Sequence, residues 1–266
     1  MEAPLLAGEH TEAAVSGNDE IDRLRGLIEA ARRIVALTGA GISTESGIPD
    51  FRGPGGTWSR IKPITYDEFV ASEAARLEDW QRRFVMNENF ARATPNDGHV
   101  GVARLWAEGR VKAVITQNID GLHQRAGLPA ESLIEIHGNA THGRCLDCES
   151  DMDLGAARRM IEATAASPRC VCGGLVKAAI ISFGQRMPEV AMQQACEHAA
   201  AADLFMVIGS SLQVRPAATL PLIAKRAGAR LVIMNAEATP LDGVADLLVR
   251  ERIGAVFRSL CSQTVN

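Results

Sequence analysis

The sequence predicts an α/β fold in which a parallel sheet is covered by helices on both faces. Short apolar runs alternate along the chain with segments of helical spacing, and this alternation is typical of parallel strands joined by helices. Two stretches, 58–93 and 139–176, break that rhythm. They predict a smaller module beside the sheet.

The predicted elements follow one another closely along the chain. A helix is expected over Ile21–Arg33, where apolar residues recur with helical spacing, and a buried strand over Ile34–Leu37. Further strands are expected at six apolar runs: Val111–Thr116, Leu133–Ile136, Ala178–Phe183, Leu204–Ile208, Leu231–Met234 and Leu247–Val249. Helices are expected at His99–Glu108, Glu189–Ala202 and Pro216–Ala227, with a polar helix at Leu154–Thr164.

The 266 residues suffice for one large domain that carries a substantial insertion. We expect residues 1–19 to form a flexible tail. The large domain is expected to comprise 20–57, 94–138 and 177–266. The insertions would form a small domain, with a helical module at 58–93 and a cysteine-bearing module at 139–176.

Composition narrows the class of protein. No apolar run reaches the length of about 18 residues that suggests a membrane span, and no basic start precedes an apolar block as in a secretory signal. The net charge is −4 and the pI is about 5.9. These values argue against a specific nucleic-acid partner. We therefore expect a cytoplasmic protein without membrane or nucleic-acid partners.

A glycine-rich segment follows the first predicted strand, at Gly39-Ala40-Gly41. Glycines after a strand allow backbone amides to approach a diphosphate, which the dipole of a following helix also favours. Thr44 stands where the usual dinucleotide motif has a third glycine, so that motif is only partly met. The charged tail Asp50-Phe51-Arg52 favours nucleotide binding over a plain strand–turn–helix connection.

Four of the six cysteines form two close pairs, Cys145 with Cys148 and Cys170 with Cys172. Cysteines at this spacing converge on one ion when the backbone turns tightly, and four thiolates complete a tetrahedron without an open position. The pattern predicts a structural zinc site. Inert or redox-active thiols are the alternative, and for Cys196 and Cys261 ordinary thiols are the better interpretation.

Polar segments follow several predicted strands, at the strand ends where ligands bind in open parallel sheets. Gln117, Asn118 and Asp120 suit hydrogen bonds to ribose hydroxyls or a carboxamide, although a solvated turn would look similar. His137 follows the next strand and is a candidate general base, because the ordinary pKa of histidine lies near working pH. Taken alone, a histidine at this place is more often structural, but the nearby glycine-rich segment and Asn118 and Asp120 favour a functional role for His137.

Together these segments resemble the sirtuin family of NAD-dependent protein deacylases, in its bacterial type. The resemblance spans about Ile21–Ala255 and rests on several long motifs. These are Gly39–Ser43, Gly47–Arg52, Thr116–His123, Ile136–Gly138, the four cysteines, Phe183-Gly184, Gly209–Leu212 with Val214 and Pro216, and Asn235.

The resemblance implies a Rossmann-like NAD-binding domain, a small domain with zinc and helical modules, and catalysis in the cleft between them. His137 would be the catalytic base, with Asn118 beside it. NAD would be bound by Gly39, Ala40, Gly41, Asp50, Phe51, Arg52, Gln117, Asn118, Asp120, Gly209, Ser210, Ser211, Asn235 and Ala236. An acyl-lysine peptide would contact Ile181, Phe183, Gly184 and Val214.

In the chemistry that the resemblance implies, the acyl oxygen attacks the ribose C1′ and expels nicotinamide. The acyl group then passes to ADP-ribose. Two rival functions share the motifs: a mono-ADP-ribosyltransferase, and a non-catalytic NAD or ADP-ribose sensor. The presence of both His137 and Asn118 argues against the sensor.

The chain departs from the usual family pattern at the peptide entrance and in the acyl pocket. Gln185 replaces a common glutamate, and Ala178 a common proline, so a preference for basic residues beside the acyl-lysine is in doubt. Members that remove acidic acyl groups use a tyrosine and an arginine. The one tyrosine of the chain, Tyr66, is too close to the glycine loop at 55–56 for that role. Arg82 does lie in the predicted helix. Because the tyrosine is missing, we expect a neutral acyl group.

Overall fold

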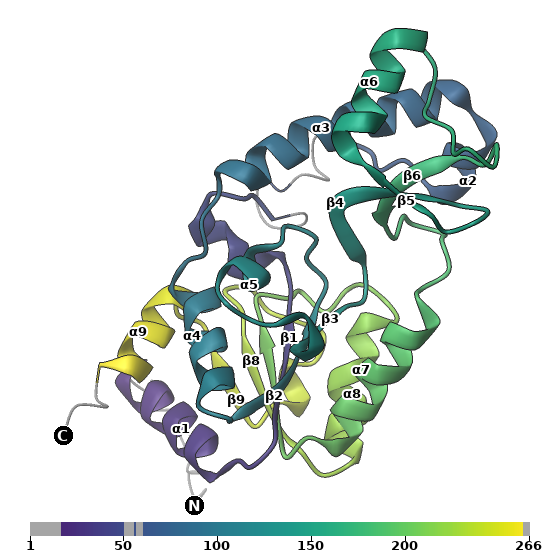
Figure 1. Cartoon of the computed structure of the whole chain (residues 1–266). Helices are drawn as coiled ribbons and strands as arrows, with labels where there is room; N and C mark the ends of the chain where they lie inside the picture. The colour runs from purple at the N-terminus through teal and green to yellow at the C-terminus, as the bar shows by residue number, and fades with distance from the viewer. Residues whose placement is uncertain (1–16, 51–55, 57–60, 263–266) are drawn as a thin grey trace, which may run out of the picture.

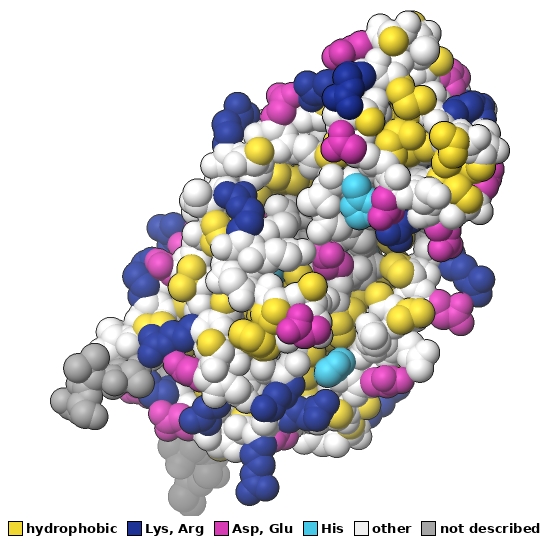
Figure 2. Space-filling view, viewed as in Figure 1, with side chains coloured by type: hydrophobic (Ala, Val, Ile, Leu, Met, Phe, Trp, Pro, Cys, Tyr) yellow, Lys and Arg dark blue, Asp and Glu magenta, His cyan; other side chains and the backbone are white. Residues whose placement is uncertain are grey.

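The computed structural model of the chain describes residues 17–50, 56 and 61–262. A large lobe holds the main sheet, and a smaller lobe is formed by α2, α3, α6 and a second sheet (Figure 1). Among the described residues, no helix is both long and apolar enough to cross a membrane. Acidic and basic side chains are interspersed over the face that Figure 2 shows.

All six strands of the main sheet run parallel, in the order β3-β2-β1-β7-β8-β9. Their bounds are Ile34–Thr38 (β1), Val111–Thr116 (β2), Leu133–Glu135 (β3), Leu204–Ile208 (β7), Arg230–Met234 (β8) and Leu247–Val249 (β9). The chain builds one half of the sheet outward from β1 and the other outward from β7. Dinucleotides bind at such a reversal, beyond the carboxyl ends of the strands.

Helices cover both faces of this sheet, which confirms the predicted fold class (Figure 1). On one face lie α1 (Gly17–Ala30), α4 (Asp97–Ala107) and α9 (Ile253–Cys261), and on the other α7 (Glu189–Ala201) and α8 (Leu220–Arg226). The alternation within β1 shows how one strand serves both layers. Ile34 and Ala36 pack toward the first group of helices, whereas Val35 and Leu37 pack toward the second.

The small lobe is built on an antiparallel sheet of order β5-β4-β6, comprising Asp151–Asp153, Gly138–Cys145 and Val176–Ile180. Its helices are α2 (Tyr66–Ala71), α3 (Glu73–Arg92) and α6 (Leu154–Thr164). Trp80 of α3 is fully buried against Ala157 and Val176, and its Nε1 donates to the Val176 carbonyl at 3.2 Å. One aromatic side chain thus joins the helical insertion to the cysteine-bearing one.

The short elements carry the connections: the 3₁₀ helices η1 (Ala40–Ser46), η3 (Ala130–Ser132), η4 (Ala217–Thr219) and η5 (Asp242–Val244), and helix α5 (Leu122–Arg125). The helix predicted at Pro216–Ala227 is therefore split between η4 and α8. The first helix ends at Ala30, three residues earlier than predicted, because the Asp203 carboxylate accepts the amides of Arg32 and Arg33.

One expectation is wrong. The strand predicted at Ala178–Phe183 runs over Val176–Ile180 and pairs in the small antiparallel sheet, not with the parallel strands. The Ile181 amide donates to the His137 carbonyl at 2.9 Å, next to the pair formed by Gly138 and Ile180, so this segment too follows β4 and not a parallel strand. The tail predicted at 1–19 overlaps α1, which begins at Gly17, and residues 1–16 lie outside the described residues. The domain boundaries, including that of the tail, stay a prediction.

Candidate active site

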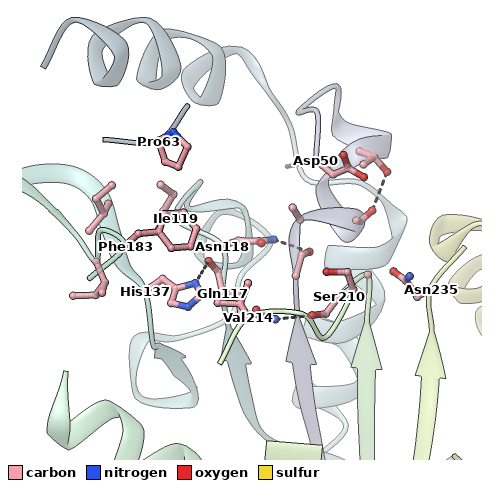
Figure 3. Close-up of a pocket in the computed structure, with 18 of the residues that line it drawn as sticks. Asp50, Pro63, Gln117, Asn118, Ile119, His137, Phe183, Ser210, Val214 and Asn235 are labelled. Carbon is pink, nitrogen blue, oxygen red and sulfur yellow. Dashed lines mark hydrogen bonds between the residues drawn. The ribbon is translucent and has the colours of Figure 1, made fainter. Parts of the chain in front are cut away.

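A cavity of about 570 Å³ lies between the lobes, at the carboxyl ends of the parallel strands. Its lining comes from the loops that follow β1, β2, β3, β7, β8 and β9, and from the small lobe at Pro63, Ile64 and Arg83. Figure 3 shows these segments converging from both lobes. The volume falls within the range typical of small-molecule sites.

The glycine loop after β1 packs directly on the loop after β7. A Cβ on Gly39 would lie 2.7 Å from the carbonyl oxygen of Gly209, and one on Gly41 would lie 2.8 Å from its Cα. Gly209 itself has φ +66°, and a Cβ there would lie 2.3 Å from the amide nitrogen of Ile42. These glycines are therefore required by the contact between the two loops, which together form one wall of the cavity.

Gln117 and Asn118, just after β2, are held by their side chains. The Nε2 of Gln117 donates to the Ser210 hydroxyl at 2.7 Å, and the Nδ2 of Asn118 donates to the Gly39 carbonyl at 3.1 Å. His137, after β3, lies with its Nδ1 2.9 Å from the Gln117 carbonyl oxygen (Figure 3). Residues from four neighbouring strand ends, those of β3, β2, β1 and β7, thus fix one another around the cavity floor.

A buried polar network supports this floor. The Ser43 hydroxyl of η1 donates to the Asp120 carboxylate at 2.7 Å and accepts from Asn118 Nδ2 at 3.3 Å. His99 lies 3.4 Å from the same hydroxyl, and its Nδ1 accepts the Asn96 amide at 3.4 Å in the capping box of α4. The Asp120 carboxylate, which accepts from Ser43, also accepts the amide of Leu122 at the start of α5, at 2.9 Å.

The two histidines of this network are kept neutral by burial. His123 lies 2.9 Å from the Thr38 hydroxyl, and its ring meets that of His99 edge-on at 5.1 Å. Burial lowers the pKa of His123 to about 3, with a smaller contribution from His99. Burial also lowers the pKa of His99 to about 4, although the charge of Asp120 opposes the shift. Both rings are therefore neutral imidazoles at neutral pH, each with a single N–H.

The predicted peptide-contacting residues line the other end of the cavity. Ile181, Phe183 and Gly184 come from the segment after β6, and Val214 comes from the loop after β7 (Figure 3). Phe183 is 42% exposed, although its backbone carbonyl accepts the Tyr66 amide at 2.8 Å. Apolar side chains around an open mouth suit an extended chain that inserts one side chain.

Most predicted site residues therefore share one cavity. The lining contains Gly39, Ala40, Gly41, Asp50, Gln117, Asn118, His137, Ile181, Phe183, Gly184, Gly209, Ser210, Ser211, Val214, Asn235 and Ala236. Asp120 is not part of the lining, because its carboxylate is turned toward Ser43 and the start of α5. Phe51 and Arg52 lie outside the described residues.

Sequence reasoning missed several lining residues. Arg83, not Arg82, borders the cavity, and its Nη2 pairs with the buried Asp79 carboxylate at 3.0 Å. Arg82 instead donates to the Lys62 carbonyl at 2.7 Å. Pro63 and Ile64 carried no signal, because they belong to an irregular segment within a stretch predicted to be helical. The Gly39–Ser43 motif marks the loop after β1, but nothing in the motif indicates that the Ser43 hydroxyl donates to the Asp120 carboxylate.

The four predicted metal ligands form a compact cluster in the small lobe. The sulfur atoms of Cys145, Cys148, Cys170 and Cys172 all lie within 4.8 Å of one another. Two of these separations are 3.5 Å and 3.6 Å, from Cys145 to Cys172 and from Cys148 to Cys170. A zinc–sulfur bond of about 2.3 Å places tetrahedral sulfurs roughly 3.8 Å apart, so the cluster fits zinc.

Comparisons with known proteins agree with this geometry. The Sir2 family model matches residues 39–216, more than half of the chain. A Bradyrhizobium diazoefficiens protein named NAD-dependent protein deacetylase 1 is 54% identical over 234 residues, 88% of this chain and 92% of that protein. A Thermodesulfovibrio yellowstonii protein named NAD-dependent protein deacetylase is 42% identical, over 92% of this chain and 96% of its own length.

Solved structures extend the likeness to three dimensions. A Sir2 complex with a p53 peptide and NAD+ has a TM-score of 0.80 at 38% identity, with 90% of this chain and 96% of that chain covered. A Sir2 protein bound to a propionylated peptide has a TM-score of 0.81 at 37% identity, with coverages of 91% and 97%. The fold, the cavity and the cysteine cluster agree with these matches, and the chain belongs to the Sir2 family, the sirtuins.

Proposed function

We propose that this chain is an NAD-dependent protein-lysine deacetylase, which transfers the acyl group of an acyl-lysine to ADP-ribose and releases nicotinamide. One observation carries the proposal. His137 lies in a cavity whose one half is lined by the glycine loops after β1 and β7, and whose other half is lined by the apolar segment after β6. The relatives named above bear the name of this activity, and one solved relative holds a peptide together with NAD+.

The half of the cavity between β1, β7 and β8 is the proposed dinucleotide site. Gly39, Ala40 and Gly41 would face the diphosphate, together with Asp50, Phe51 and Arg52. Ser210 and Ser211 with Gly209, and Asn235 with Ala236, would receive the adenosine half. The Nδ2 of Asn235 donates to the Glu237 carbonyl at 2.8 Å, which holds this side chain at the rim. Gln117, Asn118 and Asp120 would hold the nicotinamide ribose, Asp120 through its fixed neighbours.

NAD+ supplies an activated C1′–N bond, and the acyl group finally passes to the ribose. The proposed role of His137 is to accept a proton from a ribose hydroxyl. A carbonyl oxygen only accepts hydrogen bonds, so the Nδ1 beside Gln117 carries the ring proton and Nε2 is the basic nitrogen. Asn118, locked by Gly39 and Ser43, is the proposed second catalytic residue.

Apolar side chains around His137 would keep water from the reacting carbon. Ile119, Ile180 and Ile181 all border the cavity. Excluding water limits simple hydrolysis of the dinucleotide and leaves the acyl-lysine as the productive partner.

We propose a neutral acyl group as substrate. Arg83 is the positive side chain at the small-lobe end of the cavity, and Asp79, 2% exposed, pairs with it. Pairing with Asp79 offsets the positive charge that Arg83 would otherwise offer an acidic acyl chain. Tyr66 is not among the lining residues.

The zinc cluster has a structural role in this proposal, because four thiolates leave no position for water. The proposed partners are acyl-lysine proteins, without a specific nucleic acid or a membrane. A cytoplasmic location is part of the proposal, since free thiols that hold zinc persist in a reducing compartment.

Product analysis tests the function. The protein is incubated with NAD+ and an acetyl-lysine peptide, and the products are identified by mass spectrometry. The proposal requires nicotinamide, the peptide with free lysine, and O-acetyl-ADP-ribose in equal amounts. ADP-ribosylated protein without deacetylated peptide would favour the mono-ADP-ribosyltransferase instead.

A further inference from the structure

The mouth of the peptide half of the cavity is formed by two loops with open backbone groups. The first is the turn around Gly184, and the second contains Val214. Among the described residues, neither the amide nor the carbonyl of Gly184 has a hydrogen-bond partner, and the amide of Val214 has none. Two facing edges of this kind suit an extended peptide strand inserted between them.

Each of these loops carries one exposed arginine. Arg215 lines the cavity directly after Val214, and Arg186 stands between the lining residues Gln185 and Met187. Neither guanidinium forms an ion pair with a described acid. Their positive charges are therefore available to a bound peptide.

The backbone on either side of both arginines is held in place. The carbonyls of Val214 and Pro216 accept the amides of Ala218 and Thr219, each at 2.9 Å. In the other loop, the Gln185 amide donates to the Ser182 carbonyl at 3.0 Å, and its side chain accepts the Ser182 amide at 3.1 Å. The two arginines thus stand on backbone segments that are held in place, one on each loop of the mouth.

Acidic side chains of the cavity lie elsewhere. Glu45, Asp50, Glu237 and Glu251 line it on the loops after β1, β8 and β9, which is the dinucleotide half. Of the other charged lining residues, Arg252 pairs with Glu45 and Arg83 pairs with Asp79. Arg215 is thus the charged side chain of the peptide half without a partner acid among the described residues.

The acidic side chains near the mouth are few, and they lie at the starts of helices α7 and α2. Glu189 lies in the first turn of α7, where the helix dipole favours a carboxylate, and is not a lining residue. Glu68 is bound to Thr65 and Lys62 at the start of α2, and Asp67 is beside it.

We propose that Arg186 and Arg215 select acyl-lysine substrates whose neighbouring residues are acidic. The inference rests on the proposed deacetylase function and names its substrate class. An ion pair between exposed groups is weak, so two of them change affinity only severalfold. Screening by salt reduces such a preference, because exposed charges are screened over about 8 Å at physiological ionic strength.

Three acetyl-lysine peptides test the proposal, identical except that the residues beside the acetyl-lysine are aspartate, asparagine or arginine. At saturating NAD+, we expect KM to rise in that order, by about threefold to tenfold from the acidic to the basic peptide, with kcat nearly constant. The difference should shrink in about 0.5 M salt. In Arg186→Glu/Arg215→Glu the order should reverse.

Arg226→Glu is the matched control, because this exposed arginine at the end of α8 lies at the opposite end of the sheet from the cavity. It should retain the wild-type order of KM values. Equal KM values for the three peptides, a preference for the basic peptide, or the same shift in Arg226→Glu as in the double variant would overturn the proposal. Absence of turnover with all three peptides would refute the deacetylase function itself, and with it this inference.

Discussion

The Nδ1 atom of His137 lies 2.9 Å from the carbonyl oxygen of Gln117, so the histidine after β3 is oriented by the segment after β2. This single contact fixes the tautomer of the ring, because the carbonyl can only accept. It also ties the imidazole to the residues around Asn118 (Figure 3). A base whose position and protonation are both set by the backbone needs little reorganisation when substrates bind.

Replacement of His137 should therefore affect turnover more than binding. We expect His137→Ala to lower kcat by roughly 100-fold or more, as is typical for loss of a general base, and to leave NAD+ affinity nearly unchanged. The measurement combines nicotinamide release with calorimetric titration of NAD+. His198→Ala, in α7 and outside the cavity lining, is the control and should retain activity. Undiminished turnover in His137→Ala would remove the proposed role.

The buried histidine pair predicts how stability depends on pH. Burial depresses the pKa of His99 to about 4 and that of His123 to about 3. Between these values and about pH 6.5 the unfolded chain binds protons that the folded chain excludes. The contribution of these two histidines to the free energy of unfolding is therefore fully present above about pH 6.5. It falls as the pH is lowered, by up to about 1.4 kcal/mol per pH unit for each histidine.

Urea denaturation at pH 7, 6 and 5 measures this slope. His123→Gln removes one of the two groups and should flatten the dependence, whatever its stability at pH 7. An unchanged slope in the variant would show that His123 does not resist protonation in the folded protein.

Zinc loss should unfold the small lobe. Cys148 and Cys172 are exposed, and Val171 between the second pair of cysteines is fully exposed, so little apolar burial supports this turn. For a structural site, the free energy of zinc binding is folding free energy. We expect Cys148→Ala to abolish zinc binding and to lower the melting temperature, as measured by metal analysis and calorimetry. Cys196→Ala should bind one zinc, and a Cys148→Ala protein with one equivalent of zinc and normal melting would contradict the assignment.

The contact between the two glycine loops predicts a contrast between two glycine-to-alanine variants. Gly209→Ala combines a left-handed φ of +66° with a Cβ only 2.3 Å from the Ile42 nitrogen, and we expect a loss of roughly 2 kcal/mol or more. Gly26→Ala, on the exposed side of α1 with no atom within 4 Å, should instead stabilise the protein by up to about 1 kcal/mol. Chemical denaturation of both variants tests this, and equal stabilities would argue against the tight loop contact.

Elements with local signals could be predicted from the sequence. Helix α6 spans Leu154–Thr164 as predicted, and it begins there because Asp153 caps it by accepting the Ala156 amide at 2.9 Å. The strand ends at Thr116 and Ile208 could be located, since buried apolar runs stop there and polar or small residues follow. Local composition decides such boundaries.

Features that depend on distant partners could not be predicted in this way. The apolar run at Ala178–Phe183 does not reveal that β4 is its neighbour, so its sheet was misassigned. Arg82 and Arg83 are neighbours on α3 and point in different directions from the helix. The packing of α3 decides that Arg83, and not Arg82, borders the cavity. Asp120 follows a strand end like its neighbours, yet Ser43, 77 residues away in the chain, draws its carboxylate away from the cavity.

The most direct test is a crystal structure of the protein with NAD+ and an acetyl-lysine peptide. We expect the nicotinamide ribose beside the His137 imidazole, the diphosphate on the Gly39–Gly41 loop, and the peptide between Gly184 and Val214. A dinucleotide bound with its ribose remote from His137, or a His137 ring turned away from the cavity, would contradict the proposed mechanism.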